Sequence, residues 1–151
     1  MDVRIAGVRV AGTDGGPVAV VVLEPEADRD DVVPIFVGFD EAASIVRGID
    51  ALDVGRPLSH DLLLDAIEEL GGRITRVVVT AVEEGTFIAD LHLDTPRDAT
   101  VLDARPSDAM AMAARTGAPI EVADRVYEGT ARDAAEFADL QDVREVIEDD
   151  R

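Results

Sequence analysis

The stretch 100-TVLDARPSDAMAMAARTGAPI-120 sets a strand-like run directly before a helix-like run. Residues 100–104 favour a strand, and Pro106 stops strand pairing because it has no backbone N–H to donate. Ser107 is expected to cap the following helix with its hydroxyl, and Gly117 is expected to end it. The stretch therefore predicts a strand, a sharp corner and a helix.

Four polar side chains gather at this corner, namely Asp103, Arg105, Ser107 and Asp108. Capping explains Ser107, and Asp108 in the first helical turn is favoured by the positive end of the helix dipole. Asp103 and Arg105 lie where a strand ends beside a helix start, which is where α/β proteins commonly place ligand sites. The structural alternative is an ion pair of Arg105 with Asp103 or Asp108.

The first half of the chain repeats this pattern. Hairpin, short strand and helix follow one another in both halves, and aligning 34-PIFVGFDEAASIVRG-48 with the stretch from residue 100 places Glu41 on Asp108. The pattern predicts a single α+β domain with a largely antiparallel mixed sheet, built from a duplicated hairpin-strand-helix unit with packed helices. In the first copy, Asp40 is the expected helix cap.

One more helix is expected between the halves, and 55-GRPLSHDLL-63 contains its start. Ser59 is the expected cap. An apolar stripe is predicted along this helix, formed by Leu62, Leu63, Ala66, Ile67 and Leu70.

The same start forms a second polar cluster, made of Arg56, Ser59, His60 and Asp61. Such a set at a helix N-terminus suits a phosphate group. His60 and Asp61 point in different directions, so they can bind a metal or transfer a proton together only if residues from another element approach them. Asp103 and Asp108 are the candidates for this. The structural alternative is that Ser59 caps, Asp61 complements the dipole, and the other two are solvated.

The charge balance is extreme. Fourteen basic residues, all of them Arg, stand against 33 acidic ones, which gives a net charge of −19 and an isoelectric point near 4.2. A mean hydropathy of +0.09 argues against disorder, so the acidic residues are expected on a folded surface. This pattern predicts a halophilic protein, because molar salt screens the repulsion within such a surface.

Several classes of protein are not supported. The chain has no cysteine, its N-terminal segment does not read as a signal peptide, and no run approaches membrane-spanning length, so a cytoplasmic protein without membrane contact is expected. The motifs of dinucleotide-binding proteins, P-loop NTPases, zincins and serine hydrolases are missing from the sequence, so no organic cofactor is expected. Aromatic residues make up 3% of the chain, which favours a compact phosphate-centred site over base stacking along a groove.

Residues 1–128 are expected to form the folded domain and residues 129–151 an acidic helical C-terminal extension. A peripheral helix is predicted from about residue 130 to residue 150.

Two motifs carry a resemblance to a known family. RPLSHDLL at residues 56–63 and DARPSDAMAMAARTGAPI at residues 103–120 resemble the bifunctional nuclease domain family, whose members typically show RPLTHDLL and DARPSDAIALALRTGAPI. The resemblance extends over about residues 3–126, and Ser59 stands where Thr is usual, which keeps the hydroxyl. It implies an α+β fold and a nuclease that acts on RNA and DNA.

A nuclease must stabilise charge on a phosphodiester and activate water, usually through Mg²⁺ or Mn²⁺ held by carboxylates. The resemblance thus makes Asp103 and Asp108 candidate metal ligands. The candidate catalytic residues are His60, Asp61 and Asp108. The candidate substrate-binding residues are Arg56, Ser59, Arg105 and Ser107. Glu41, the repeat counterpart of Asp108, is a further candidate.

Two alternatives compete with a nuclease. One is a non-catalytic binding or oligomerisation module in which the polar corners lock the repeats together or form a homo-oligomer interface, and a homo-oligomer is expected in any case. The other is a small-anion sensor that holds a nucleotide or phosphate at a helix N-terminus without cleaving it. An active site would leave His60, Asp103 and Asp108 in an open cleft, whereas an interlock would leave them paired and closed.

Overall fold

The computed structural model describes residues 1–52 and 55–149. The first half contains β1 (Asp2–Thr13), β2 (Gly16–Pro25), β3 (Asp31–Val37) and α1 (Phe39–Ile49). After α2 (Ser59–Glu69), the second half contains β4 (Arg73–Glu83), β5 (Thr86–Asp94), β6 (Ala99–Ala104) and α3 (Pro106–Thr116). The chain continues through β7 (Ile120–Val122), α4 (Asp124–Thr130), β8 (Arg132–Asp133), α5 (Ala135–Ala138), β9 (Gln141–Asp142) and α6 (Val143–Asp149).

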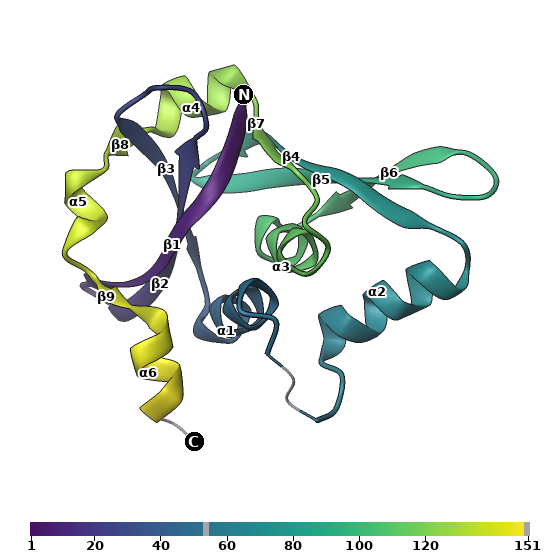
Figure 1. Ribbon diagram of the computed structural model, residues 1–151. Coiled ribbons are helices and arrows are strands. Elements are labelled where there is room, and N and C mark those ends of the chain that lie inside the picture. The colour runs from purple at the N-terminus through teal and green to yellow at the C-terminus, as the bar shows by residue number, and fades with distance from the viewer. Residues whose placement is uncertain (53–54, 150–151) are drawn as a thin grey trace.

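The strands form one sheet in the order β6-β5-β4-β7-β1-β2-β3-β8, and β9 pairs with β1 (Figure 1). β7 pairs parallel with β4, whereas the other pairings in the described part of the chain are antiparallel. The two strand triplets flank β7, and a helix follows each triplet. The predicted α+β domain with a duplicated hairpin-strand-helix unit is therefore confirmed.

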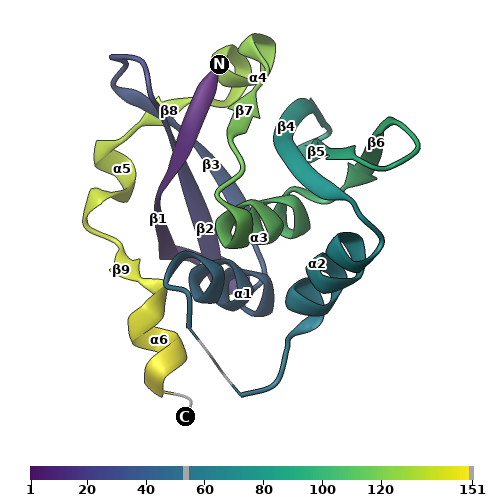
Figure 2. The same cartoon turned by 45° about the vertical axis from the view of Figure 1, so that its right-hand side comes forward.

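α1 and α3 lie side by side, as both views show (Figures 1 and 2). Gly48 allows this close approach, because a Cβ atom at this position would lie 2.9 Å from Nη1 of Arg115 and 3.1 Å from Cβ of Ala114. Gly117 ends α3 in the left-handed region at a φ of 74°, as the sequence predicts. The C-terminal ends of α1 and α3 therefore lie close together.

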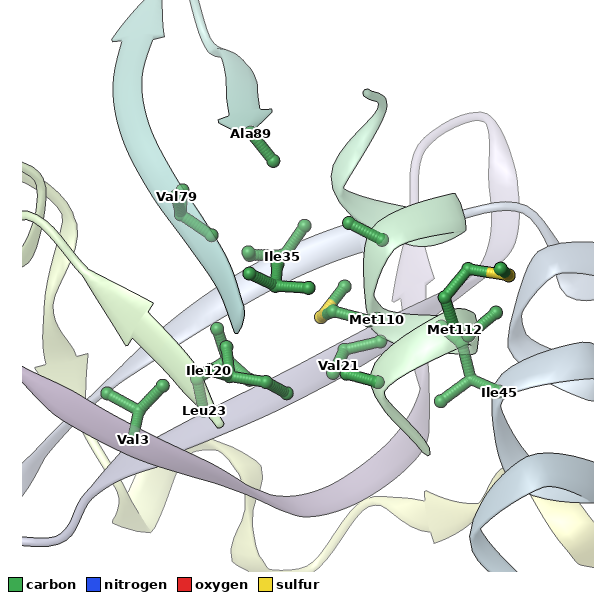
Figure 3. Packing of buried hydrophobic residues seen from close by; sticks show 14 of the residues in the cluster. Val3, Val21, Leu23, Ile35, Ile45, Val79, Ala89, Met110, Met112 and Ile120 are labelled. Atoms are coloured by element: carbon green, nitrogen blue, oxygen red, sulfur yellow. The ribbon is translucent and has the colours of Figure 1, made fainter. Parts of the chain in front are cut away.

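The main core lies between these two helices and the sheet (Figure 3). Met110 and Met112 of α3 are fully buried, and Met112 lies beside Ile45 of α1. Met110 lies over Val21 and Ile35 of the sheet. Flexible methionine side chains fill irregular gaps well, so the core explains both of them without a ligand.

The helices begin earlier than the sequence suggests. The expected caps Asp40, Ser59 and Ser107 are wrong, and the caps are Gly38, Leu58 and Arg105. Arg105 is extended, with φ of −68° and ψ of 140°, because the ring of Pro106 disfavours the helical conformation in the preceding residue. Pro106 itself suits the first helical position. Asp108 is confirmed in the first turn, as the third helical residue.

The face by which α2 packs also differs from the prediction. Leu62, Leu63 and Leu70 are 62%, 49% and 79% exposed, and no residue of α2 is fully buried. Of the predicted stripe, only Ile67 packs against the core, together with Leu64. The cause is polar, because the hydrogen bonds of His60 with Ser44 and Asp108, and the one that Asp61 accepts from Arg115, hold α2 against α1 and α3 by its polar side.

The single helix expected over residues 130–150 is wrong. α5 and α6 are separated by the short strand β9, and β8 pairs with β3 before them. Phe137 of α5 packs on the face of the sheet opposite to α1 and α3, against a cluster formed by Val20, Val22 and Val32. Residues 150–151 of the expected extension lie outside the described residues. No helix in the described ranges is long and apolar enough to cross a membrane.

Candidate active-site cleft

A cleft of about 830 Å³ opens where α1 meets the first turns of α2 and α3, and α6 forms a further wall. Ser44 and Glu41 line it from α1, His60 and Ser59 from α2, and Asp108 from α3, with Arg105 just before α3. The other lining residues are Pro17, Phe39, Asp40, Ala43, Arg47, Leu58, Val146 and Ile147. The cleft thus combines carboxylate, imidazole, hydroxyl and guanidinium groups on three helices.

His60 is hydrogen-bonded at both ring nitrogens. Its Nδ1 lies 2.6 Å from Oγ of Ser44, and its Nε2 lies 2.9 Å from Oδ1 of Asp108. Arg115 donates from Nη2 to the same Ser44 Oγ over 3.1 Å. Since the serine oxygen accepts from Arg115, its own proton is free to donate to Nδ1, and the Nε2–H then donates to Asp108. With this assignment of hydrogens, each polar group from Arg115 through Ser44 and His60 to Asp108 has a hydrogen-bond partner.

Asp108 and Glu41 occupy the third position of their helices, and both pair with Arg105. Nε of Arg105 donates to Oδ2 of Asp108 over 3.1 Å, and its Nη1 lies 3.6 Å from Oε1 of Glu41. Burial raises the pKa of Asp108, but hydrogen bonds from His60 and Arg105 outweigh it, so the pKa lies below its ordinary value. Asp108 is therefore an ionised acceptor at neutral pH. The Arg105 side chain is 68% exposed, so it can still contact a bound anion.

Asp61 faces away from His60. Its Oδ2 accepts the backbone N–H of Leu58 over 2.9 Å, and its Oδ1 accepts from Nε of Arg115 over 2.6 Å. The hydrogen bond from Arg115 lowers the pKa of Asp61 and outweighs the effect of burial. Asp61 thus supports the site through Arg115 and does not line the cleft.

Arg115 and Ser44 are the site residues that the sequence analysis missed. The Arg115 side chain is only 7% exposed, and its Nη1 also donates to the backbone oxygens of Ser44 and Ala111 over 3.0 and 2.9 Å. It therefore joins α1, α2 and α3. The available signals were weak: an Arg in the last turn of a helix is ordinary, and Ser44 stands one turn after Glu41 without a motif around it.

The structure brings five of the candidate site residues to the cleft, namely Glu41, Ser59, His60, Arg105 and Asp108. Ser107 is buried and lines a smaller cavity of about 340 Å³ on the other side of Arg105. Arg56 is exposed, does not line the cleft and makes no side-chain hydrogen bond or ion pair within the described ranges. Asp103 is exposed on β6 and stands opposite Asp90 in the register of β5 and β6. It does not line the cleft.

The fit of a metal ion can be judged from the donor groups. Among residues 1–52 and 55–149, no group of three or more His, Asp or Glu side chains is arranged to hold a metal ion. The predicted pair of ligands is separated, because Asp103 lies outside the cleft while Asp108 is bound to His60 and Arg105. The described residues thus do not form a metal site by themselves.

Comparisons with known proteins agree with the motifs and the fold. A sequence model of the bifunctional nuclease domain matches residues 21–134, and the chain belongs to this family. An uncharacterized protein of Mycobacterium tuberculosis is 42% identical over 125 residues, which cover 83% of this chain and 73% of the relative. Bifunctional nuclease 2 of Arabidopsis thaliana is 27% identical over 109 residues, covering 70% of this chain and 33% of that protein. Bifunctional nuclease 1 of Oryza sativa subsp. japonica is 25% identical over 116 residues, covering 75% and 35%.

Proposed function

We propose that this protein is a nuclease that hydrolyses phosphodiester bonds of RNA and DNA in the cleft between α1, α2 and α3. The observation that carries the proposal is the hydrogen-bonded His60 and Asp108 pair in a cleft that also contains the exposed guanidinium of Arg105. A positioned acid–base group beside a cation is what phosphodiester hydrolysis requires. The names of the plant relatives point to the same activity.

In the proposed mechanism, Arg105 binds the phosphodiester and stabilises the negative charge that develops on its oxygens. Both nitrogens of His60 are occupied, so the attacking water cannot bond to the ring directly in this arrangement. Ser44 lines the cleft, so its hydroxyl accepts a proton from the water and gives its own proton to Nδ1 of His60. The resulting hydroxide forms a bond to phosphorus as the P–O ester bond breaks, and the leaving oxygen takes a proton from solvent. The ionised Asp108 then stabilises the imidazolium that forms.

A requirement for Mg²⁺ or Mn²⁺ stays a part of this proposal, because Mg²⁺ often binds one or two carboxylates together with phosphate oxygens of the substrate. No step above depends on a metal. We also propose that the protein acts in a salt-rich cytoplasm, in which a net charge of −19 is screened and direct contacts replace long-range attraction of the substrate.

The test is cleavage of single-stranded RNA and DNA by the purified protein in about 2 M KCl, a salt level that keeps the acidic surface screened. Reactions contain Mn²⁺, Mg²⁺ or a chelator, and His60→Ala and Asp108→Ala are assayed in parallel. Cleavage that both folded variants lose supports the nuclease. Cleavage that persists unchanged in both variants comes from a contaminant. Loss of cleavage by the wild-type protein when chelator is added shows that a metal ion is required.

A small-anion sensor is the second candidate. The exposed guanidinium of Arg105 beside the first turn of α3 favours it, because such a group can hold an anion without any catalytic step. Tight binding of a nucleotide by calorimetry with no cleavage of any nucleic acid would identify this function.

A further inference from the structure

We propose that Arg47 forms a second phosphate subsite in the cleft, so that the preferred substrates are short oligonucleotides carrying a phosphate next to the scissile phosphodiester. The inference rests on the proposed function, in which the protein cleaves a nucleic acid and Arg105 holds the scissile phosphodiester. It assigns to Arg47 a role in binding that none of the sequence motifs indicates.

The unusual feature of Arg47 is a buried nitrogen without a partner. Nε of Arg47 is the only buried side-chain nitrogen or oxygen in the described ranges that lacks a hydrogen bond. Its guanidinium also forms no ion pair with any described residue, although the chain has 33 acidic residues and 14 basic ones. Arg47 therefore lines the cleft with a positive charge that no described carboxylate pairs, and an anionic ligand in the cleft would supply the missing counter-charge.

Arg47 lies on the same face of α1 as the other cleft residues. It follows Ser44 by three residues and Glu41 by six, which corresponds to about 4.5 and 9 Å along the helix axis. Arg105 is paired with Glu41, which stands in the first turn of α1, whereas Arg47 belongs to its last turn. A separation of this order suits neighbouring phosphates of an extended single strand, with the groups of Ser44 and His60 between them.

α6 limits the cleft at the Arg47 end. Its Val146 and Ile147 line the cleft, and Arg144 fastens the helix to Asp50 through hydrogen bonds of 2.7 and 2.9 Å. Apolar side chains there exclude water from a phosphate bound to Arg47, which strengthens the ionic contact. Beyond the cleft, a chain with a net charge of −19 offers little attraction to a longer polyanion. The affinity is therefore concentrated on the few groups that fit inside.

The test compares three substrates in about 2 M KCl: a dinucleoside monophosphate, its 5′-phosphorylated form and its 3′-phosphorylated form. We expect one phosphorylated form to have a KM about tenfold lower than that of the unphosphorylated dinucleotide, as for one charge-assisted contact. Arg47→Gln removes this difference, because it raises KM for the phosphorylated form to that of the unphosphorylated dinucleotide. Arg47→Lys retains part of the difference because it keeps the charge.

The matched control is Arg97→Gln, which removes the same charge from the exposed turn between β5 and β6, outside the cleft lining. It leaves the preference for the phosphorylated substrate intact. Melting curves establish that all variants are folded. Equal KM values for the three substrates with the wild-type protein, or an equal change for all three in Arg47→Gln, would overturn the subsite while leaving the nuclease in place.

Failure of the nuclease itself is recognised separately. If none of the dinucleotides is cleaved, calorimetric titration compares a nucleoside 3′,5′-bisphosphate with the 5′- and 3′-monophosphates. Tighter binding of the bisphosphate that Arg47→Gln abolishes supports the subsite in an anion-binding protein. Equal affinity for the bisphosphate and the monophosphates rejects it.

Discussion

The hydroxyl oxygen of Ser44 lies 2.6 Å from Nδ1 of His60, although the two residues are 16 positions apart and belong to different helices. Asp108 takes the other ring nitrogen and is itself held by Arg105. In the proposed mechanism, the proton of the attacking water enters this series of side chains at Ser44, which lines the cleft. Ser44, which no sequence motif marks, is therefore the proposed link between His60 and the substrate.

Replacing Ser44 with Ala is expected to lower kcat by about 100-fold or more, the lower range for loss of proton transfer. KM for the substrate should change little, because Arg105 remains in place. Ser44→Thr keeps a hydroxyl and should retain part of the activity. The measurement is single-turnover cleavage across a pH series, and a Ser44→Ala variant with an unchanged rate would rule out the relay.

The Arg115 contacts predict an effect on stability. Arg115→Met should lower the free energy of unfolding by about 1.5–3 kcal/mol, the range for hydrogen bonds to a charged group, because it removes the links from α3 to Asp61 and Ser44. Arg132→Met is the control, since the pair of Arg132 with Glu136 is exposed to solvent and contributes little to stability. Denaturant unfolding in about 2 M KCl measures both, and equal losses in the two variants would contradict the role of Arg115.

Much of the fold was predictable because local chemistry and tertiary structure agree. The strand-like run before Pro106 marked β6, and the order of hairpin, strand and helix in both halves indicated the duplication. The helix starts were less accurate, because Pro106 decides the first turn of α3 more strongly than the capping preference of Ser107. The C-terminal segment misled the helix prediction, since two-residue strands such as β9 depend on β1 and leave no periodic signal.

The candidate site was predictable where its residues stand at helix starts. His60, Arg105 and Asp108 lie close to N-termini, where polar clusters attract notice. The contacts of Arg115 with Asp61 and Ser44 span 54 and 71 positions and follow from the packing of three helices, which sequence spacing does not encode. Together with the hydrogen bonds of His60, the contact of Arg115 with Asp61 holds α2 by its polar side and leaves most of the predicted apolar stripe exposed.

The lowered pKa of Asp61 predicts how stability depends on pH. A carboxyl with a folded-state pKa below its ordinary value of 3.8 stabilises the fold at higher pH, and the contribution is lost as pH falls through the folded-state pKa. Asp61→Asn should therefore be less stable than the wild type at neutral pH, and the difference should shrink below about pH 4. Denaturant titrations over a pH series measure it, and a constant difference across that range would contradict the assignment.

The acidic surface predicts a dependence on salt. At about 0.1 M salt the Debye length is about 10 Å and the negative charges repel one another, whereas at about 1 M it falls to about 3 Å. The melting temperature should thus rise steadily with KCl concentration and rise further than that of a near-neutral protein of similar size under the same conditions. Equal increases in the melting temperatures of the two proteins would show that the acidic surface does not make the fold depend on salt.

The exposed face of α2 predicts self-association. Leu62, Leu63, Ala66 and Leu70 fall within an arc of about 100° on the helix, and exposed apolar faces of this kind commonly mark interfaces. We expect a homo-oligomer in about 2 M KCl, where salt also strengthens apolar association, and we expect the double variant Leu62→Glu with Leu70→Glu to be a monomer. Light scattering after size-exclusion chromatography measures both masses. A monomeric wild-type protein at concentrations well above those of the activity assay would remove this expectation, whereas an oligomer that the variant retains would move the interface to another face of the molecule.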